Sequence, residues 1–236
     1  MIKPPGPVRW GLGDVAWVWP AIIVGQVLAG TVVFVARGGT EGYVVNAYDI
    51  VGTVAGGAIA TVGVLALLGM VKGRGSLLAD YGLVVRLRDW RWLLVGIGLS
   101  IVATLATALI DVVSNTTPQQ EVVRAIERSS TLGQVLGAVA VVTLAPLAEE
   151  LLFRGLLLRA LLRRMGAVAA AMISGGLFAL SHLVDPGAAP FLAPLMLVGV
   201  VSAIRAIRTG ELSQSVLLHA GFNLTAAISL IAGWPK

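Results

Sequence analysis

The longest apolar stretch of the chain covers residues 132–162 and reads LGQVLGAVAVVTLAPLAEELLFRGLLLRALL. Its charged side chains are few, namely Glu149, Glu150, Arg154 and Arg159, and the rest is dominated by Leu, Ala and Val. A helix that crosses a membrane needs about 20 mainly apolar residues. We therefore expect residues 132–162 to form one membrane-spanning helix that carries an unusual charged group near its middle.

The whole composition supports a lipid solvent. The 236 residues are 57% hydrophobic and only 12% charged, and the mean hydropathy is +0.92. Soluble domains carry about 25% charged residues, so a soluble fold lacks the polar surface it needs here. The chain contains no cysteine, which excludes disulfides and thiolate metal sites. The sequence predicts an all-α, polytopic transmembrane helix bundle.

Six further apolar stretches bring the expected number of spans to about seven. The first is too long for a signal-peptide core, so we expect it to be retained as a span. We divide the chain into residues 1–130, with three N-terminal helices and their loops, and residues 131–236, with four core helices. The six stretches are residues 15–36, 50–71, 92–113, 167–184, 189–207 and 212–234.

The basic residues give an independent check on this layout. With the N-terminus inside, 12 lysines and arginines fall on the inner side and 4 on the outer side, with Arg154 left within a span. This bias follows the positive-inside rule and explains the net charge of +5 without a nucleic-acid partner. We expect a multi-pass protein of the cell (plasma) membrane, with a cytoplasmic N-terminus and the C-terminus outside.

Two connecting segments have a pattern of their own. Residues 77–91 mix apolar and basic side chains and are expected along the inner interface. Thr117, Pro118 and Gln120 have the spacing of a helix start, with Thr117 as N-cap and Gln120 closing a capping box. We expect a surface helix without chemistry there, which faces the membrane with Val122, Val123 and Ile126.

Ionisable groups within a span are costly, about 2.5 to 3.5 kcal/mol each at the centre of the bilayer on insertion scales. Glu150 and Arg154 are four residues apart, so they share a helix face and can pair. Glu149 is rotated by about 100° from Glu150 and has no such partner on its own helix. We therefore expect Glu149 to face a neighbouring helix.

The polar groups that Glu149 could meet are in two later spans. The only two histidines are His182 in residues 167–184 and His219 in residues 212–234, where Asn223 follows one turn later. If these helices pack together, a carboxylate, two imidazoles and a carboxamide converge in one cavity. Such groups can activate water, and two imidazoles with a carboxylate also form a plausible site for a divalent metal ion.

Each of these residues also has a purely structural explanation. A Glu–Arg pair can join helices without chemistry, and an intramembrane histidine or asparagine often only donates a hydrogen bond to a neighbouring helix. Phe178, one turn before His182, is more simply a wall residue. We favour a functional site because three separate segments carry groups that suit one task.

The three segments resemble the CPBP family of intramembrane proteases, which includes the type II CAAX prenyl endopeptidases and the bacterial Abi-type proteins. The family pattern is a glutamate pair with an arginine four residues after the second, then Phe-x-x-x-His, then His-x-x-x-Asn or Asp. The resemblance covers about residues 130–230. Its motifs stand here as Glu149-Glu150-x-x-x-Arg154, Phe178-x-x-x-His182 and His219-x-x-x-Asn223.

The resemblance implies a membrane endopeptidase with a cavity open to the membrane and the cytosol. By it, Glu149 activates the hydrolytic water and His182 assists it or ligates a metal, while His219 and Asn223 orient the water or stabilise the oxyanion. The supporting residues are Glu150, Arg154 and Phe178. The family has been described both as metal-dependent and as metal-free, so a divalent ion such as Zn²⁺ on Glu149, His182 and His219 stays one of two alternatives.

The expected partners are the lipid bilayer and a membrane-associated protein or peptide substrate, which need not be prenylated. Two other functions stay open at this point. A bundle with buried Glu, Arg, His and Asn can be a transporter or proton relay, although the internal repeat common in transporters is not evident. A non-catalytic member that acts as an immunity or scaffold protein is the other alternative.

Overall fold

The computed structural model describes residues 8–40, 42–114 and 119–232. Within these residues, 7 helices are long and apolar enough to cross a membrane, which confirms the predicted all-α bundle of about seven spans. In chain order the helical elements are α1 (Leu12–Ala36), α2 (Ala47–Lys72), α3 (Leu77–Tyr81), η1 (Leu87–Asp89), α4 (Arg91–Ser114), α5 (Glu121–Glu127), α6 (Thr131–Val139), η2 (Ala140–Leu144), α7 (Ala145–Glu150), η3 (Leu151–Leu157), α8 (Leu158–Leu162), α9 (Ala167–Ser181), η4 (His182–Val184), η5 (Pro186–Phe191), α10 (Leu192–Thr209) and α11 (Ser213–Ala232).

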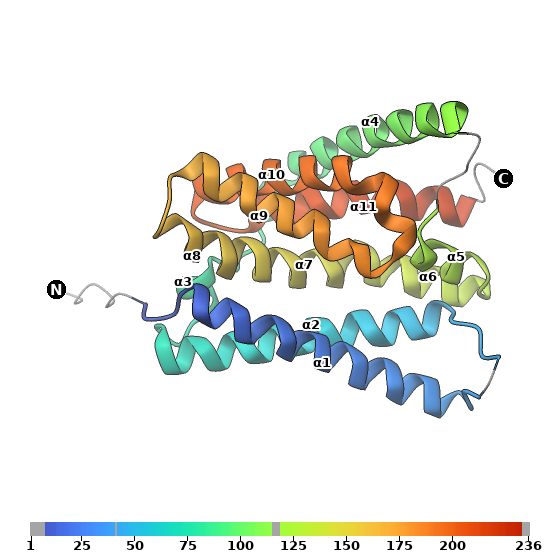
Figure 1. Cartoon of the computed structure of the whole chain (residues 1–236), viewed down its shortest axis with the longest axis horizontal. Helices are drawn as coiled ribbons and strands as arrows, with labels where there is room; N and C mark the ends of the chain where they lie inside the picture. The colour runs from blue at the N-terminus through green and yellow to red at the C-terminus, as the bar shows by residue number, and fades with distance from the viewer. Residues whose placement is uncertain (1–7, 41, 115–118, 233–236) are drawn as a thin grey trace.

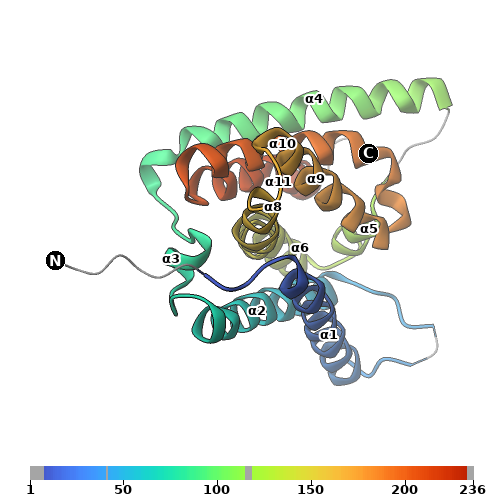
Figure 2. The same ribbon diagram turned by 60° about the vertical axis from the view of Figure 1, so that its left-hand side comes forward.

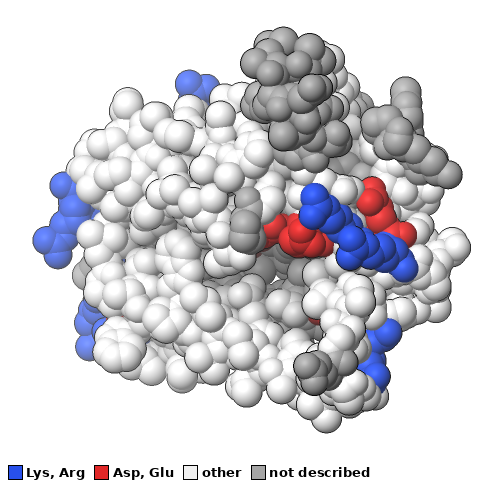
Figure 3. Space-filling model, turned by 45° about the vertical axis from the view of Figure 1, so that its right-hand side comes forward, with Lys and Arg blue, Asp and Glu red and all other residues white. Residues whose placement is uncertain are grey.

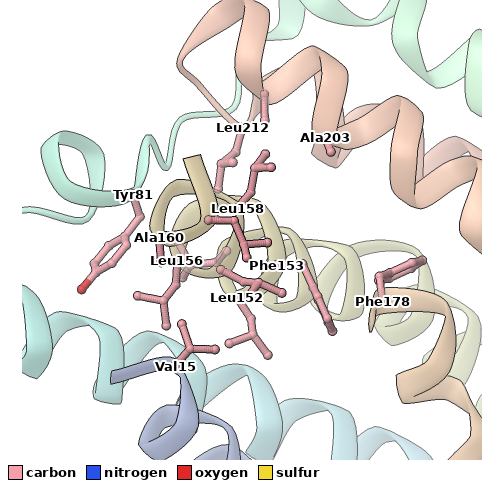
Figure 4. Packing of buried hydrophobic residues seen from close by; sticks show 14 of the residues in the cluster. Val15, Tyr81, Leu152, Phe153, Leu156, Leu158, Ala160, Phe178, Ala203 and Leu212 are labelled. Atoms are coloured by element: carbon pink, nitrogen blue, oxygen red, sulfur yellow. The ribbon is translucent and has the colours of Figure 1, made fainter. Parts of the chain in front are cut away.

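The longest apolar stretch is the central helix of the bundle. It runs without a break from α6 to α8 (Thr131–Leu162), and every residue of its η3 segment is buried. Its leucines and Phe153 point into a cluster that also contains Phe178 and Leu212 from neighbouring helices (Figure 4). Burial on all sides explains why this stretch is apolar all round and not amphipathic.

The other helices form layers around this central helix. The pair α1 and α2 covers one side of it, and α9, α10 and α11 cover the other, with α4 packed outside against α11 (Figures 1 and 2). Large apolar side chains such as Ile59, Leu105 and Val168 are exposed on the outside. The surface in Figure 3 is accordingly mostly uncharged, as lipid contact requires.

The connections alternate between the two ends of the bundle. The turn from α8 to α9 lies at the left end in Figure 1, together with the C-terminal end of α2, and the loop from α9 to α10 lies at the right end, together with α5. The alternation is the one that the basic residues predict. Which end faces the cytoplasm stays a prediction.

Two glycines let α4 and α11 cross in close contact. A Cβ atom on Gly96 would collide with the carbonyl oxygen of Leu218, and one on Gly221 would collide with the carbonyl oxygen of Leu93. Backbone atoms cannot move aside as a flexible side chain can, so both positions require glycine. Small residues at helix crossings are typical of membrane bundles, and this crossing fixes the part of α11 that carries His219.

The segment between α2 and α4 lies at the left end of the bundle in Figure 1, and part of it packs into the protein core. Its Tyr81 is fully buried, stacks on Trp10 with ring centroids 5.3 Å apart, and donates to the carbonyl oxygen of Leu65 at 3.0 Å. Burial and the nearby carboxylates of Asp80 and Asp14 raise the pKa of Tyr81, so its phenol stays a neutral donor. The segment therefore ties α2 to the centre of the fold.

The helix expected in this connection is present as α5 (Glu121–Glu127), but its predicted start was wrong. Thr117 and Pro118 lie outside the described residues, but α5 begins only at Glu121, and Gln120 precedes it in extended conformation without a side-chain cap. The carboxylate of Asp185 accepts hydrogen bonds from the first two amides of α5 instead, at 2.8 Å from Glu121 and 3.4 Å from Val122. The start of α5 is therefore capped by Asp185, which is distant in the sequence, and not by the predicted local capping box.

The predicted face of α5 was also wrong. Ile126 is only 3% exposed, and it lines a cavity between helices together with Val122 and Val123, so these side chains point into the bundle. α5 packs against α2, α6 and α11. A Cβ on Gly137 of α6 would lie 3.0 Å from the Ile126 side chain, which shows how closely α5 packs.

Candidate active site

The side chains that the motifs single out line one cavity. Glu149 comes from the end of α7, His182 is the first residue of η4, and His219 and Asn223 lie one turn apart on α11. All four line a cavity of about 320 Å³ between α4, α5, α6 and α11. We call it the α11 cavity. The separate segments on which the motifs lie are thus brought together by the packing of α7, α9 and α11.

The two adjacent glutamates have different surroundings. The Glu150 side chain is fully buried and its Oε1 lies 3.0 Å from Nη1 of Arg154, which is also fully buried. The Glu149 side chain is 32% exposed and opens into the cavity. The predicted pairing of Glu150 with Arg154 is confirmed, and Glu149 does face a neighbouring helix, as the offset of one residue indicates.

His219 connects the two glutamates. Its Nδ1–H donates to Oε1 of Glu150 at 3.1 Å, and its Nε2 lies 3.7 Å from Oε2 of Glu149. A carboxylate oxygen can only accept, so the contact with Glu150 places the proton on Nδ1 and leaves Nε2 as an acceptor when the ring is neutral. The sequence did not predict this contact, because the approach of α11 to α7 is a tertiary property.

His182 is oriented by the end of its own helix. The last carbonyl oxygens of an α-helix have no intrahelical partner, and the carbonyl oxygen of Phe178 accepts from Nδ1–H of His182 at 2.9 Å. Because the proton of the neutral ring is on Nδ1, as in His219, Nε2 of His182 is an acceptor. The four-residue spacing of Phe178 and His182 is therefore what fixes the tautomer.

Phe178 lies between the polar groups. Its ring is fully buried and makes edge contacts with His182, at 4.9 Å between centroids, and with His219, at 5.3 Å. The guanidinium of Arg154 lies over the same ring, 4.6 Å from its centroid. The phenyl ring thus sets the spacing between the two histidines and keeps Arg154 on the side of Glu150.

Asn223 bonds to a backbone carbonyl oxygen that the helical hydrogen-bond pattern leaves without a partner. In the π-helical η2 the N–H of Ala145 bonds to the carbonyl oxygen of Ala140, five residues back. The next residue in this pattern, Pro146, has no N–H to offer to Val141. The carbonyl oxygen of Val141 accepts instead from Nδ2 of Asn223 at 2.9 Å. Such π-helical segments are frequent at functional sites.

The residues expected as metal ligands do not form a ready ligand set. The described part of the chain contains no group of three or more His, Cys, Asp and Glu side chains arranged to hold a metal ion. Nδ1 of each histidine is engaged, by Phe178 in one case and by Glu150 in the other, and this would still leave Nε2 of each ring able to bind a metal. We therefore derive no step through a metal ion.

Several residues around Glu149 were not predicted as site residues. A second cavity of about 280 Å³ lies between α1, α2 and α7, and Gln26 and Thr61 line it; we call it the α1–α2 cavity. Glu149 and His182 line both cavities. Gln26 is polar within a span, and this was the one available signal.

The fold and the site together define a class: a polytopic membrane protein with a cavity-facing carboxylate, two oriented imidazoles and a buried Glu–Arg pair. Residues 131–225 match the family model described as type II CAAX prenyl endopeptidase Rce1-like. This confirms the resemblance expected from the motifs and supports a CAAX-type protease of the membrane. No curated protein and no solved structure matches the chain.

Proposed function

We propose that this protein is an intramembrane endopeptidase that hydrolyses peptide bonds of membrane-associated substrates at the α11 cavity, with Glu149 as the general base. One observation carries the proposal: a partly exposed carboxylate, Glu149, lies 3.7 Å from the acceptor nitrogen of His219 at the wall of a cavity. Oε2 of Glu149 is enclosed and has no hydrogen-bond partner, and 3.7 Å exceeds hydrogen-bond length, so we assign a bridging water to this contact.

The reaction begins with that water. Since Oε2 of Glu149 and Nε2 of His219 are both acceptors, a water between them donates one hydrogen to each, and its lone pairs point to a third side. Glu149 takes one proton as the oxygen attacks the carbonyl carbon of the scissile peptide bond. The C–N bond then breaks, and Glu149 returns the proton to the leaving amine. One water is consumed, and a carboxylic acid and an amine are formed.

The remaining groups support these transfers. Asn223 has a second N–H on Nδ2 beyond the one that bonds to Val141, and it can stabilise the oxyanion. Nε2 of His182 is a further acceptor at the wall of the cavity and assists the proton transfers. Glu150, fixed by Arg154, keeps His219 in the tautomer that the water requires.

The experiment is a cleavage assay in proteoliposomes. Purified protein is incubated with a pool of peptides extracted from membranes, and new peptide termini are identified by mass spectrometry. We expect termini that appear with the wild-type protein and are missing with Glu149→Ala. The same assay after EDTA treatment, with and without added Zn²⁺, measures the need for a divalent ion. A wild-type protein that generates no new termini would favour a transporter or scaffold function.

A further inference from the structure

The α11 cavity and the α1–α2 cavity meet at the proposed catalytic residues. Both are lined by Glu149 and His182, and both are also lined by Gln120 and Val122 near the start of α5. Glu149 is therefore reached from two sides of α7. A chain that passes through both cavities would place its middle at this carboxylate.

The two cavities differ in their walls. The α11 cavity is mainly apolar away from the site, with side chains such as Leu195, Phe222 and Leu230. The α1–α2 cavity carries the carboxamide of Gln26 and the side chain of Asp185 at its walls. The part of this wall that α1 and α2 supply, including Gln26, lies outside residues 131–225, which match the family model.

Gln26 is placed by its neighbour on α2. A Cβ on Gly57 would lie 2.7 Å from both Cγ and Nε2 of Gln26, so the glutamine side chain lies flat against this glycine. The side chain of Gln26 makes no hydrogen bond to another described residue, and the same holds for Gln120. A carboxamide in a span without such a partner is costly, so its retention points to a polar ligand.

A peptide that is cut inside a membrane supplies such a ligand. The scissile carbonyl must be free of helical hydrogen bonds before water can attack it, so the residues around it are extended. Their N–H and C=O groups then lack partners in an apolar cavity, which is unfavourable unless the protein provides them. A carboxamide offers both donors and an acceptor.

We infer that the substrate crosses Glu149 as an extended segment that occupies both cavities, and that Gln26 and Gln120 bind its backbone amides and carbonyls. The inference rests on the proposed function and adds two substrate-binding residues, one of them from α1. An apolar portion of the substrate lies in the α11 cavity, and the portion across the scissile bond lies between α1, α2 and α7.

The test uses Gln26→Leu and Gln120→Leu, with Gln119→Leu as the matched control. The carboxamide of Gln119 bonds to Glu127 at 2.8 Å and to Arg124 at 3.3 Å, and it lines neither cavity. The probe is the peptide of the membrane-extracted pool that the wild-type protein cleaves fastest, made by synthesis. Loss of one neutral hydrogen bond to the substrate should raise KM about 2- to 12-fold. Because ground state and transition state lose it equally, kcat should stay within about 2-fold.

A second measurement starts with the wild-type protein alone, so its first result does not depend on whether these variants fold. The probe is N-methylated at one backbone amide at a time, and KM is measured with the wild-type protein. We expect sensitive amides on both sides of the cut, and we expect the amide bound by Gln26 to lose its sensitivity in Gln26→Leu. Sensitivity on one side only, or an unchanged KM in both variants, would overturn the inference while the proposed function stands. A wild-type protein without cleavage overturns both.

Discussion

Glu149 and Glu150 are adjacent in the chain, yet one opens into a cavity and the other is enclosed. The difference follows from the helix, which turns neighbouring side chains about 100° apart. Glu150 meets Arg154 at 3.0 Å and His219 at 3.1 Å, with no exposed surface. A carboxylate placed in this way holds other groups, while Glu149 is the one that a substrate can reach.

Glu150→Gln should therefore be a stability variant first. It leaves Arg154 as an uncompensated buried charge, which costs about 3 to 5 kcal/mol when a buried pair is broken. We expect a markedly lower melting temperature and yield in detergent. Because Glu150 also orients His219, turnover per folded molecule should fall as well. A melting temperature equal to that of the wild-type protein would contradict the pairing.

At the scale of the element, α5 depends on a single acceptor from another part of the chain. The carboxylate of Asp185 binds the amides of Glu121 and Val122, and it also binds the amide of Gly187 at 2.8 Å. The same carboxylate follows His182 by three residues. Asp185 thus links α5, which lines the α11 cavity, to the segment that carries His182.

Asp185→Ala should loosen α5 locally. Hydrogen bonds to a charged acceptor contribute about 1.5 to 3 kcal/mol, which corresponds to an opening equilibrium raised about 10- to 100-fold. Hydrogen–deuterium exchange of the amides in α5 should become faster by that factor, with the amides of α1 as internal reference. Unchanged exchange in α5 would show that other contacts hold it.

The crossing of α4 and α11 gives a second prediction at this scale. Gly96→Ala and Gly221→Ala each put a methyl group against a backbone carbonyl, and such overpacking costs about 1 to 3 kcal/mol. Gly98→Ala is the matched control on α4, because a Cβ there meets nothing within 4 Å. Melting temperatures in detergent should fall for the first two variants only. A fall of equal size in Gly98→Ala would mean that the close crossing is not the cause.

Local patterns predicted the elements well and their partners poorly. All seven spans follow from apolar length, and the Glu150–Arg154 pair follows from helical spacing. The cap of α5 could not be predicted, because its acceptor, Asp185, is far along the chain. The hydrogen bond from Asn223 to the carbonyl oxygen of Val141 depends on the π-helical turn before Pro146. Helix propensities of the residues do not indicate where such a turn forms.

At the scale of the molecule, the two ends of the bundle should lie on opposite sides of the membrane. The chain has no cysteine, so single cysteines can be introduced and labelled cleanly. Gly166→Cys is suitable because a Cβ there meets nothing within 4 Å, and Ala189→Cys is suitable because the residue is exposed. Gly187 is avoided, since a Cβ there would lie 2.5 Å from a backbone oxygen.

The positive-inside bias predicts that position 166 is labelled only from the cytoplasm and position 189 only from outside. Membrane-impermeant maleimide is applied to intact cells and to inverted vesicles, and it shows from which side each position is labelled. Labelling of the two positions from the same side would contradict the seven-span layout. Reversed labelling would keep the layout and contradict the orientation.

We propose that Glu149 activates water at the meeting point of the two cavities. The most direct test is turnover per folded molecule of Glu149→Gln against the wild-type protein, in proteoliposomes and with the same synthetic peptide. Loss of a general base should lower turnover by about 10² to 10⁴-fold, while the melting temperature stays close to that of the wild-type protein. Normal turnover in Glu149→Gln would contradict the claim and assign the base to another residue.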